Sequence, residues 1–149
     1  MKILFLHGLE SKPGGSKPQY LEGLGHVVLN PHLPREDFGA SVRIAQEEID
    51  LELPDLVVGS SRGGAVAMSL DLKGAGLILI APAWRRFDVA SNVPAGTKVL
   101  HCTTDSIVHY EDSEEIKGGA ELVPCGDDHR MSDTDALEAL GNAIKGMGR

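Results

Sequence analysis

Three features are scarce in this chain of 149 residues: cysteine, basic charge and long apolar runs. The two cysteines, Cys102 and Cys125, form neither a disulfide framework nor a zinc-binding pattern, and we expect two buried thiols. The longest apolar run, residues 76–81, has the length of a strand and falls far short of the roughly 20 residues that cross a membrane. These absences argue against a disulfide-rich, a zinc-binding or a membrane-spanning protein.

The charge balance argues against a further group of functions. Asp and Glu number 22 against 14 Lys and Arg, which gives a formal net charge of −8. A nucleic-acid-binding protein needs a basic face, and an acidic chain is repelled by anionic membranes. We therefore predict no nucleic-acid partner and no membrane partner. The first residues lack the pattern of a signal peptide, so we expect a cytoplasmic location.

Length and patterning indicate one α/β domain over residues 1–149. Six short apolar segments predict strands at residues 3–6, 26–29, 56–58, 76–80, 98–102 and 120–123. Helices are expected over residues 16–24, 41–51, 62–70 and 132–147, with Ser132 as the N-cap of the last, and a short helix beginning over 113–116. This alternation predicts a mostly parallel sheet of about six strands with helices on both faces.

The segment Gly59-Ser60-Ser61-Arg62-Gly63 reads G-x-S-x-G between a predicted strand and a predicted helix. In that position the motif is typical of a nucleophile elbow, a tight turn that presents a serine at the end of a strand. Glycine allows such a turn to close, because it has no Cβ. We predict that Ser61 is a nucleophile; the alternative is an ordinary Gly/Ser turn.

Residues that could activate Ser61 follow the ends of two other predicted strands. Asp105 comes after the fifth strand and His129 after the sixth, and the carboxyl ends of parallel strands meet at one edge of a sheet. His129 would accept the serine proton, while Asp105 would orient the imidazole and stabilise its cation. Asp127 and Asp128 remain alternative acids, although they adjoin His129 in sequence and are poorly placed to bond its ring.

The other histidines and acidic residues have simpler interpretations. His26 and His101 fall in predicted strands and are expected to be structural, whereas His32 and His109 lie in loops and could line a pocket. The acidic residues between 111 and 115 are expected to form the solvated start of a helix.

Acyl transfer also needs hydrogen-bond donors for the negative oxygen of its tetrahedral intermediate. The backbone N–H of Arg62, at the start of a predicted helix, is one candidate. The N–H of Leu9, in the loop after the first strand, is the second, and His7 is expected to support this loop. Three further residues are candidates for the substrate pocket: Trp84, His32 and Ile107.

With these motifs the chain resembles the α/β-hydrolase superfamily. The matching pieces are L-H-G-x-x-S at residues 6–11, G-S-S-x-G-G at 59–64, the Asp105 loop and G-D-D-H at 126–129, and small serine esterases share the first two. The resemblance implies oxyanion donors at Leu9 and Arg62. The usual fold has eight strands, so two leading strands would be absent. Segment 82–96, where many relatives carry a helical lid, is short, which implies an open, lidless site.

Together these features predict a serine hydrolase that cleaves carboxylic esters, or thioesters, of small or protruding acyl groups through Ser61, His129 and Asp105. No metal or organic cofactor is implied. A non-catalytic binding protein on the same scaffold and an acyltransferase remain alternatives. The side chain of Arg62 is expected to be solvated, or else to meet an acidic group of the substrate. The pair Arg85-Arg86 has the same two interpretations.

Overall fold

A computed structural model describes residues 1–8 and 13–147. Its central element is a sheet of six strands, which are parallel throughout the described ranges and follow the order β2-β1-β3-β4-β5-β6. The strands are β1 (Lys2–Leu6), β2 (Val27–Leu29), β3 (Leu56–Ser60), β4 (Gly76–Ile80), β5 (Lys98–His101) and β6 (Glu121–Pro124). The predicted α/β class and strand number are confirmed, while His26 lies just before β2 rather than in it.

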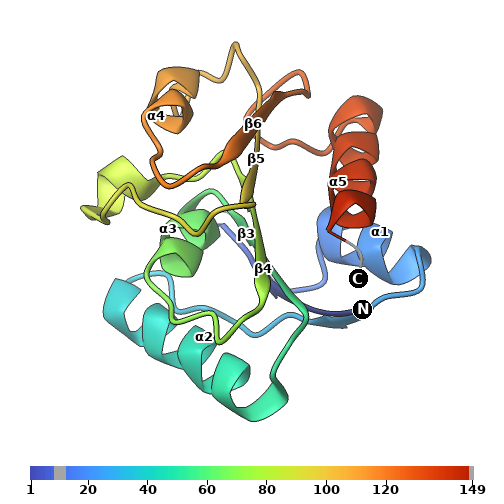
Figure 1. Cartoon of the computed structure of the whole chain (residues 1–149), viewed down its shortest axis with the longest axis vertical. Coiled ribbons are helices and arrows are strands. Elements are labelled where there is room, and N and C mark those ends of the chain that lie inside the picture. Colours follow the sequence, from blue (N-terminus) through green and yellow to red (C-terminus); the bar gives the residue numbers. More distant parts are fainter. Residues whose placement is uncertain (9–12, 148–149) are drawn as a thin grey trace.

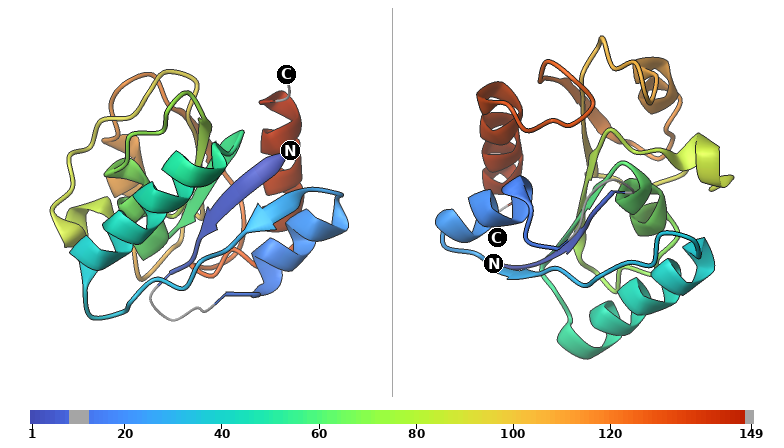
Figure 2. Two further views of the ribbon diagram at one scale, coloured as in Figure 1. Left: turned by 90° about the horizontal axis from the view of Figure 1, so that it is seen from below. Right: turned by 180° about the vertical axis from the view of Figure 1, so that it is seen from behind.

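Helices cover both faces of this sheet, as predicted (Figure 1). One face carries α1 (Ser16–Gly23) and α5 (Thr134–Gly146), and the other carries α2 (Phe38–Glu52) and α3 (Arg62–Met68). Figure 2 shows the same two layers from below and from behind. Two shorter elements complete the second layer: η1 (Trp84–Phe87) packs on α3, and α4 (Tyr110–Glu114) packs on β5.

The apolar strands are explained by burial on both faces. In β1, Ile3 and Phe5 pack with the cluster beneath α1 and α5, whereas Leu4 and Leu6 pack with the cluster beneath α2 and α3. Successive side chains of a strand point to opposite faces, so a strand between two helical layers needs apolar residues at every position. Each such side chain contributes about 1.5–3 kcal/mol by its burial.

Two helices begin at other residues than the sequence predicts, because capping side chains determine their first residues. The last helix begins at Thr134, because the side chain of Asp133 accepts a hydrogen bond from the N–H of Ala136. The prediction that Ser132 is its N-cap is therefore wrong. In the same way α2 begins at Phe38, capped by a side-chain carboxylate one residue earlier, rather than at residue 41.

The short helix α4 is displaced as well. It spans Tyr110–Glu114 and so begins three residues before residue 113, where its start was predicted. The side chain of Ser113 is buried and points into the protein, where it bonds a histidine described below. The acidic residues Glu111 and Asp112 do occupy its first turn, where the helix dipole favours negative charge.

The strand order creates a topological switch point at one edge of the sheet. The chain leaves β1 for β2 on one side and later places β3 on the other side of β1. Ligands of open parallel sheets bind at such a switch point, outside the carboxyl ends of the strands. His7 and Gly8 follow β1, and Ser61 follows β3, so both predicted motifs lie at this position.

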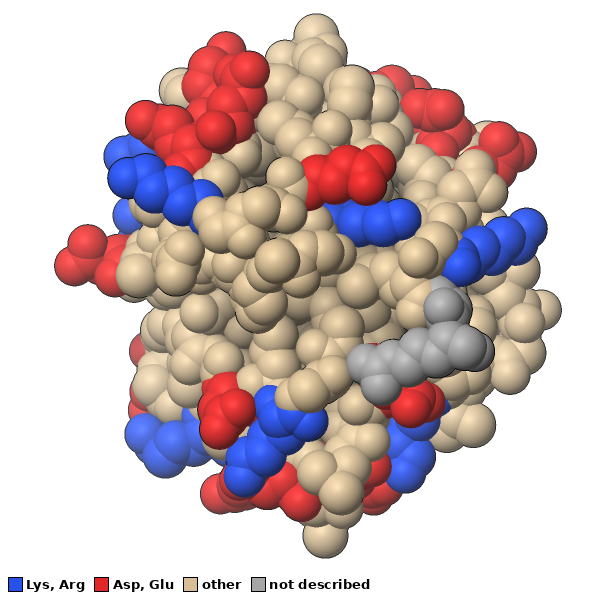
Figure 3. Space-filling model, viewed as in Figure 1, with Lys and Arg blue, Asp and Glu red and all other residues tan. Residues whose placement is uncertain are grey.

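The surface mixes charges of both signs. On the face seen in Figure 3, Lys and Arg side chains lie among Asp and Glu side chains. Both cysteines are free; Cys102 is buried and Cys125 is partly buried. Across residues 1–8 and 13–147, every helix is too short or too polar to span a bilayer.

Candidate active site

The predicted nucleophile occupies a strained backbone conformation. Ser61, in the turn between β3 and α3, has φ 56° and ψ −115°, a region that residues with a Cβ rarely adopt. Its N–H donates to the carbonyl of Ile80 at 2.8 Å, and its carbonyl accepts from the N–H of Ala83 at 3.0 Å. Two backbone hydrogen bonds from β4 and the following loop thus hold the serine in this conformation.

Two glycines of the motif allow the elbow to approach the sheet. A Cβ on Gly63 would lie 2.5 Å from the carbonyl carbon of Leu6 in β1 and would overlap its oxygen. A Cβ on Gly59 would lie 2.9 Å from the Cβ of Ala67 in α3. Only glycine fits at these two positions, because backbone and helix approach more closely than a side chain permits.

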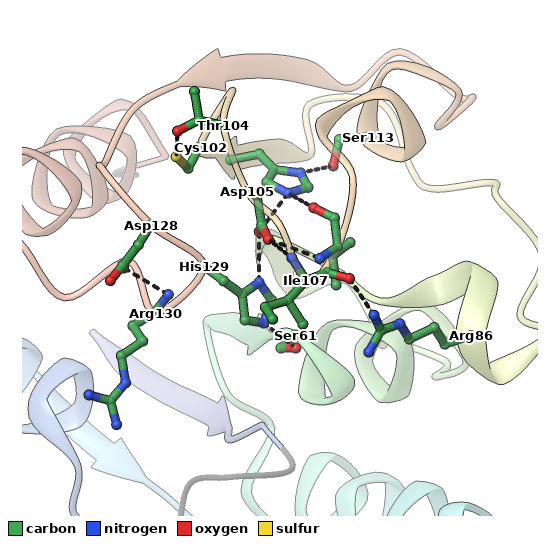
Figure 4. A network of polar contacts seen from close by, with 12 residues as sticks. Ser61, Arg86, Cys102, Thr104, Asp105, Ile107, Ser113, Asp128, His129 and Arg130 are labelled. Carbon is green, nitrogen blue, oxygen red and sulfur yellow. Dashed lines mark hydrogen bonds and ion pairs between the residues drawn. The ribbon is translucent and has the colours of Figure 1, made fainter.

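Ser61, His129 and Asp105 form a chain of hydrogen bonds (Figure 4). The Oγ of Ser61 lies 2.9 Å from Nε2 of His129, and Nδ1 of His129 lies 2.7 Å from Oδ2 of Asp105. A carboxylate can only accept, so Nδ1 carries the proton and Nε2 accepts from the serine hydroxyl. The three side chains come from the loops after β3, β6 and β5, as the sequence predicts.

The two alternative acids lie elsewhere. Asp128 accepts a hydrogen bond from the backbone N–H of Arg130, and the N–H of Asp127 donates to the carboxylate of Asp133. Among the described residues, Asp105 is the predicted acid that bonds the ring of His129.

The carboxylate of Asp105 is fully buried yet well supported. Its Oδ1 accepts hydrogen bonds from the backbone N–H groups of Ile107 at 2.8 Å and Val108 at 2.9 Å. Burial acts to raise the pKa of Asp105, but the hydrogen bonds from His129, Val108 and Ile107 outweigh it and hold this pKa below its ordinary value. Asp105 is therefore ionised at neutral pH and can stabilise a positive charge on His129.

Asp105 has a second histidine partner, which we expected from the sequence to be structural. His101, the last residue of β5, places its Nε2 3.1 Å from Oδ2 of Asp105. The signal that could have identified it is its position at a strand end, four residues before the acid.

His7 and Gly8, which follow β1, lie close to Ser61. His7 is buried; its Nε2 accepts the N–H of Leu33 at 3.0 Å, so Nδ1 carries the proton and donates to the carbonyl of Gly8 at 2.9 Å. Burial lowers the pKa of His7, which keeps the ring neutral. A Cβ on Gly8 would lie 3.3 Å from that of Ser61. Leu9, the predicted second oxyanion donor, lies outside the described residues.

Arg62 begins α3, so its backbone N–H has no acceptor within the helix. The expectation that its side chain is solvated is wrong, because the side chain is only 2% exposed. The guanidinium carbon lies 5.6 Å from the ring centroids of both Phe38 and Phe87, and Nη2 donates to the carbonyl of Pro34 at 2.8 Å. Burial lowers the pKa of Arg62. Its guanidinium thus links α2 and η1 to α3, the helix that follows Ser61.

The three predicted pocket residues differ in their surroundings. Trp84 is buried, and its indole N–H donates to the carbonyl of Asp112 at 3.0 Å, which fastens η1 to α4. His32 is exposed, with its ring 5.9 Å from that of His7. Ile107 is 48% exposed on the loop that holds Asp105.

Arg85 and Arg86 are both exposed and bonded within the protein. Arg85 pairs with Asp112 and Glu115 and lies over the ring of Trp84. Arg86 donates to the backbone carbonyl of Ile107, as Figure 4 shows, and so tethers η1 to the Asp105 loop.

The segment in which a lid helix could lie, residues 82–96, contains no such helix. Segment 82–96, all of it described, holds only the single turn η1. A cavity of about 460 Å³ lies at the opposite edge of the sheet, between Met1, Gly76 and Lys98, and no predicted site residue lines it. Within residues 1–8 and 13–147, no three His, Cys, Asp or Glu side chains gather as a metal site requires.

Solved structures share this arrangement of elements. Mouse α/β hydrolase domain-containing protein 10 matches with a TM-score of 0.78 at 16% identity, covering 98% of this chain and 88% of its own. An α/β serine hydrolase without a lid from Xanthomonas campestris matches with a TM-score of 0.70 at 18% identity, over 97% and 79%. The esterase domain of a Rhodothermus marinus protein matches with a TM-score of 0.66 at 17% identity, over 97% and 84%.

Over its described residues the chain has the fold of the α/β-hydrolase superfamily, with six parallel strands. The sequence itself matches no protein-family model and no curated protein. At 16–18% identity the likeness to the three solved structures concerns the fold.

Proposed function

We propose that this protein is a serine hydrolase that cleaves carboxylic esters, with thioesters as the nearest variant, through an acyl-enzyme on Ser61. The observation that carries the proposal is the hydrogen-bond chain from Ser61 through His129 to Asp105, with separations of 2.9 and 2.7 Å. The α/β-hydrolase fold, which includes serine hydrolases and an esterase among its solved members, supports the same class.

In the first half of the reaction, Ser61 Oγ attacks the carbonyl carbon of the ester while its proton passes to Nε2 of His129. The tetrahedral intermediate then expels the alcohol, which takes that proton from His129, and leaves an acyl group on Ser61. In the second half a water molecule repeats the attack, His129 again relays the proton, and the carboxylic acid leaves. Asp105 stabilises the imidazolium in both halves, because its buried carboxylate stays ionised.

The negative oxygen of each intermediate needs donors that are already in place. The backbone N–H of Arg62, without an acceptor inside α3, is one. We propose the N–H of Leu9, in the loop after β1, as the second. Loss of one such donor typically raises the barrier by about 3–4 kcal/mol.

The open edge around Ser61 suits small or protruding acyl groups. No lid helix is present in segment 82–96 to enclose a long acyl chain. The exposed side chain of Ile107 offers an apolar contact on the loop that holds Asp105. Each step uses only side chains, backbone N–H groups and water, so the mechanism requires no metal or organic cofactor.

The proposal is tested by the hydrolysis of p-nitrophenyl acetate and butyrate with the wild type, Ser61→Ala and Ser69→Ala. Ser69 caps the far end of α3, where its hydroxyl donates to the carbonyl of Ala65, and it is the matched control. We expect Ser69→Ala to match the wild type and Ser61→Ala to lose turnover. A folded wild type without turnover on any ester would favour a binding protein on a hydrolase scaffold. Ester exchange with added alcohol would indicate an acyltransferase.

A further inference from the structure

The hydrogen-bond chain does not end at Asp105 but continues behind it (Figure 4). The ring of His101 is fully buried at the end of β5. Its Nε2 lies 3.1 Å from Oδ2 of Asp105 and 3.0 Å from the carbonyl oxygen of Val108, and its Nδ1 lies 2.6 Å from Oγ of Ser113. One imidazole therefore joins the acid of the site to helix α4.

These partners determine where the ring of His101 carries its proton. Nε2 faces a carboxylate and a carbonyl, which can only accept, so Nε2 must be the donor. The hydroxyl of Ser113 can donate to Nδ1, which completes the bonding of the neutral ring. The N–H of His101 is thus shared between the carbonyl of Val108 and Oδ2 of Asp105, the oxygen that also bonds His129.

We propose that His101 is a positioning residue of the catalytic group, which fixes Oδ2 of Asp105 and moderates the negative charge that this oxygen presents to His129. The proposal rests on the hydrolase function proposed above. The hydrogen bonds of His101 go to Asp105, Val108 and Ser113, so it would act on Ser61 and His129 through Asp105.

Fixation follows from the way both oxygens of Asp105 are occupied. Oδ1 accepts the N–H groups of Ile107 and Val108, and Oδ2 accepts from His129 and His101. A carboxylate held by four donors cannot rotate about its Cβ–Cγ bond without breaking several of them. Removal of His101 would leave Oδ2 with one donor, the His129 ring itself.

Moderation of charge follows from the sharing of Oδ2. A donor that bonds a carboxylate oxygen draws charge from it and weakens its attraction for a second, cationic partner. Without His101, Oδ2 would attract the protonated ring of His129 more strongly. His129 would then stay protonated to higher pH, and the acid side of the activity profile would move to higher pH.

Other titratable groups surround the two rings. They are Tyr110 of α4 beside His101, Cys125 next to β6, Asp128 and Arg130 in the loop of His129, and Lys17 of α1, which donates to the carbonyl of Arg130. Burial lowers the pKa of Lys17 to about 8 and raises that of Cys125 to about 11. The test of His101 therefore compares the titration midpoint of His129 between variants in which Lys17 and Cys125 are unchanged.

The first test needs no catalytic turnover. In Ser61→Ala protein, ¹⁵N NMR of the imidazoles gives the tautomer of His101 and the titration of His129, with signals assigned by single histidine substitutions. We expect His101 to carry its proton on Nε2. A proton on Nδ1 alone would overturn the proposal, because Nε2 could not then donate. A protein that hydrolyses no ester would leave this result intact, so failure of the proposed function is distinguished from failure of the proposal.

The second test compares His101→Gln with His101→Leu. The amide nitrogen of glutamine reaches the position of Nε2 and keeps a donor to Asp105, whereas leucine has none. We expect His101→Leu to lower kcat about tenfold with little change in KM, and to raise the titration midpoint of His129 by about half a pH unit or more. We expect His101→Gln to restore both values to near those of the wild type.

Two outcomes of this comparison would contradict the proposal. A folded His101→Leu protein with an unchanged His129 midpoint would assign His101 a purely structural role. A folded His101→Gln protein as defective as His101→Leu would show that a donor at Nε2 is not what matters. If His101→Leu does not fold, two other measurements decide between a positioning role and a purely structural role. They are the tautomer of the His101 ring in the wild type and the titration midpoint of His129 in His101→Gln.

Discussion

Replacement of Ser61 by glycine should make the protein more stable than replacement by alanine. Both variants remove the hydroxyl and its hydrogen bond to His129, so they differ only in the Cβ. At φ 56° and ψ −115° a residue with a Cβ is strained by about 1–3 kcal/mol, and glycine is not. Glycine loses about 0.5–1 kcal/mol through the greater freedom of its unfolded chain. We therefore expect the free energy of unfolding of Ser61→Gly to exceed that of Ser61→Ala by about 1 kcal/mol.

Urea unfolding followed by the fluorescence of Trp84, the one tryptophan of the chain, measures this difference. A gain of about 1 kcal/mol corresponds to a rise in Tm of about 2–4 °C for a domain of this size. Ser69 provides the matched control, because its φ of −95° and ψ of 0° suit any residue. There glycine should be less stable than alanine by about 0.5–1 kcal/mol. If the alanine variant is more stable than the glycine variant at position 61 as well as at position 69, the assignment of backbone strain to Ser61 is refuted.

Further predictions concern the acid and the elbow. Asp105→Asn should stay folded and lose about 10⁴-fold in kcat, because an amide favours the wrong tautomer of the histidine; near-normal turnover would exclude Asp105 as the acid. The folded pKa of Asp105 lies below the unfolded value of about 3.9, so its stabilisation is complete above that value and is lost as the pH falls through the folded pKa. The advantage of the wild type over Asp105→Asn in unfolding free energy should therefore shrink as the pH falls below about 4, and a constant difference would contradict this. Gly63→Ala should lower the free energy of unfolding by about 3 kcal/mol, because its methyl group would overlap the carbonyl of Leu6. Gly23→Ala, with open space around it, is the control and should be neutral or stabilising in the same unfolding assay.

The features that the sequence predicts well are those set by local pattern. The all-apolar segment of β1 requires cover on both faces, and the structure provides it. The G-x-S-x-G turn is a local motif whose glycines are needed for contacts within a few residues and with one neighbouring strand. Asp105 and His129 could be selected because parallel strands bring their carboxyl ends to one edge.

The features that escape prediction depend on contacts between distant segments. Arg62 is buried because Phe38 and Phe87, from two other elements, lie against its guanidinium, and no pattern near residue 62 encodes this. In the sequence His101 has the pattern of an ordinary strand residue, and its contact with Asp105 arises only because the loop that carries Asp105 folds back against it. The start of α5 escaped for a different reason, since Ser132 and Asp133 are both good N-caps and only the geometry selects Asp133.

The central claim is that Ser61 is an activated nucleophile, and covalent labelling tests it most directly. The folded protein is treated with a fluorophosphonate, and mass spectrometry of its peptides locates the adduct. We predict one adduct, on Ser61, which is absent from Ser61→Ala and forms much more slowly in Asp105→Asn. An unlabelled wild type, or an adduct on another residue, would contradict the assignment of Ser61, His129 and Asp105 as a catalytic group.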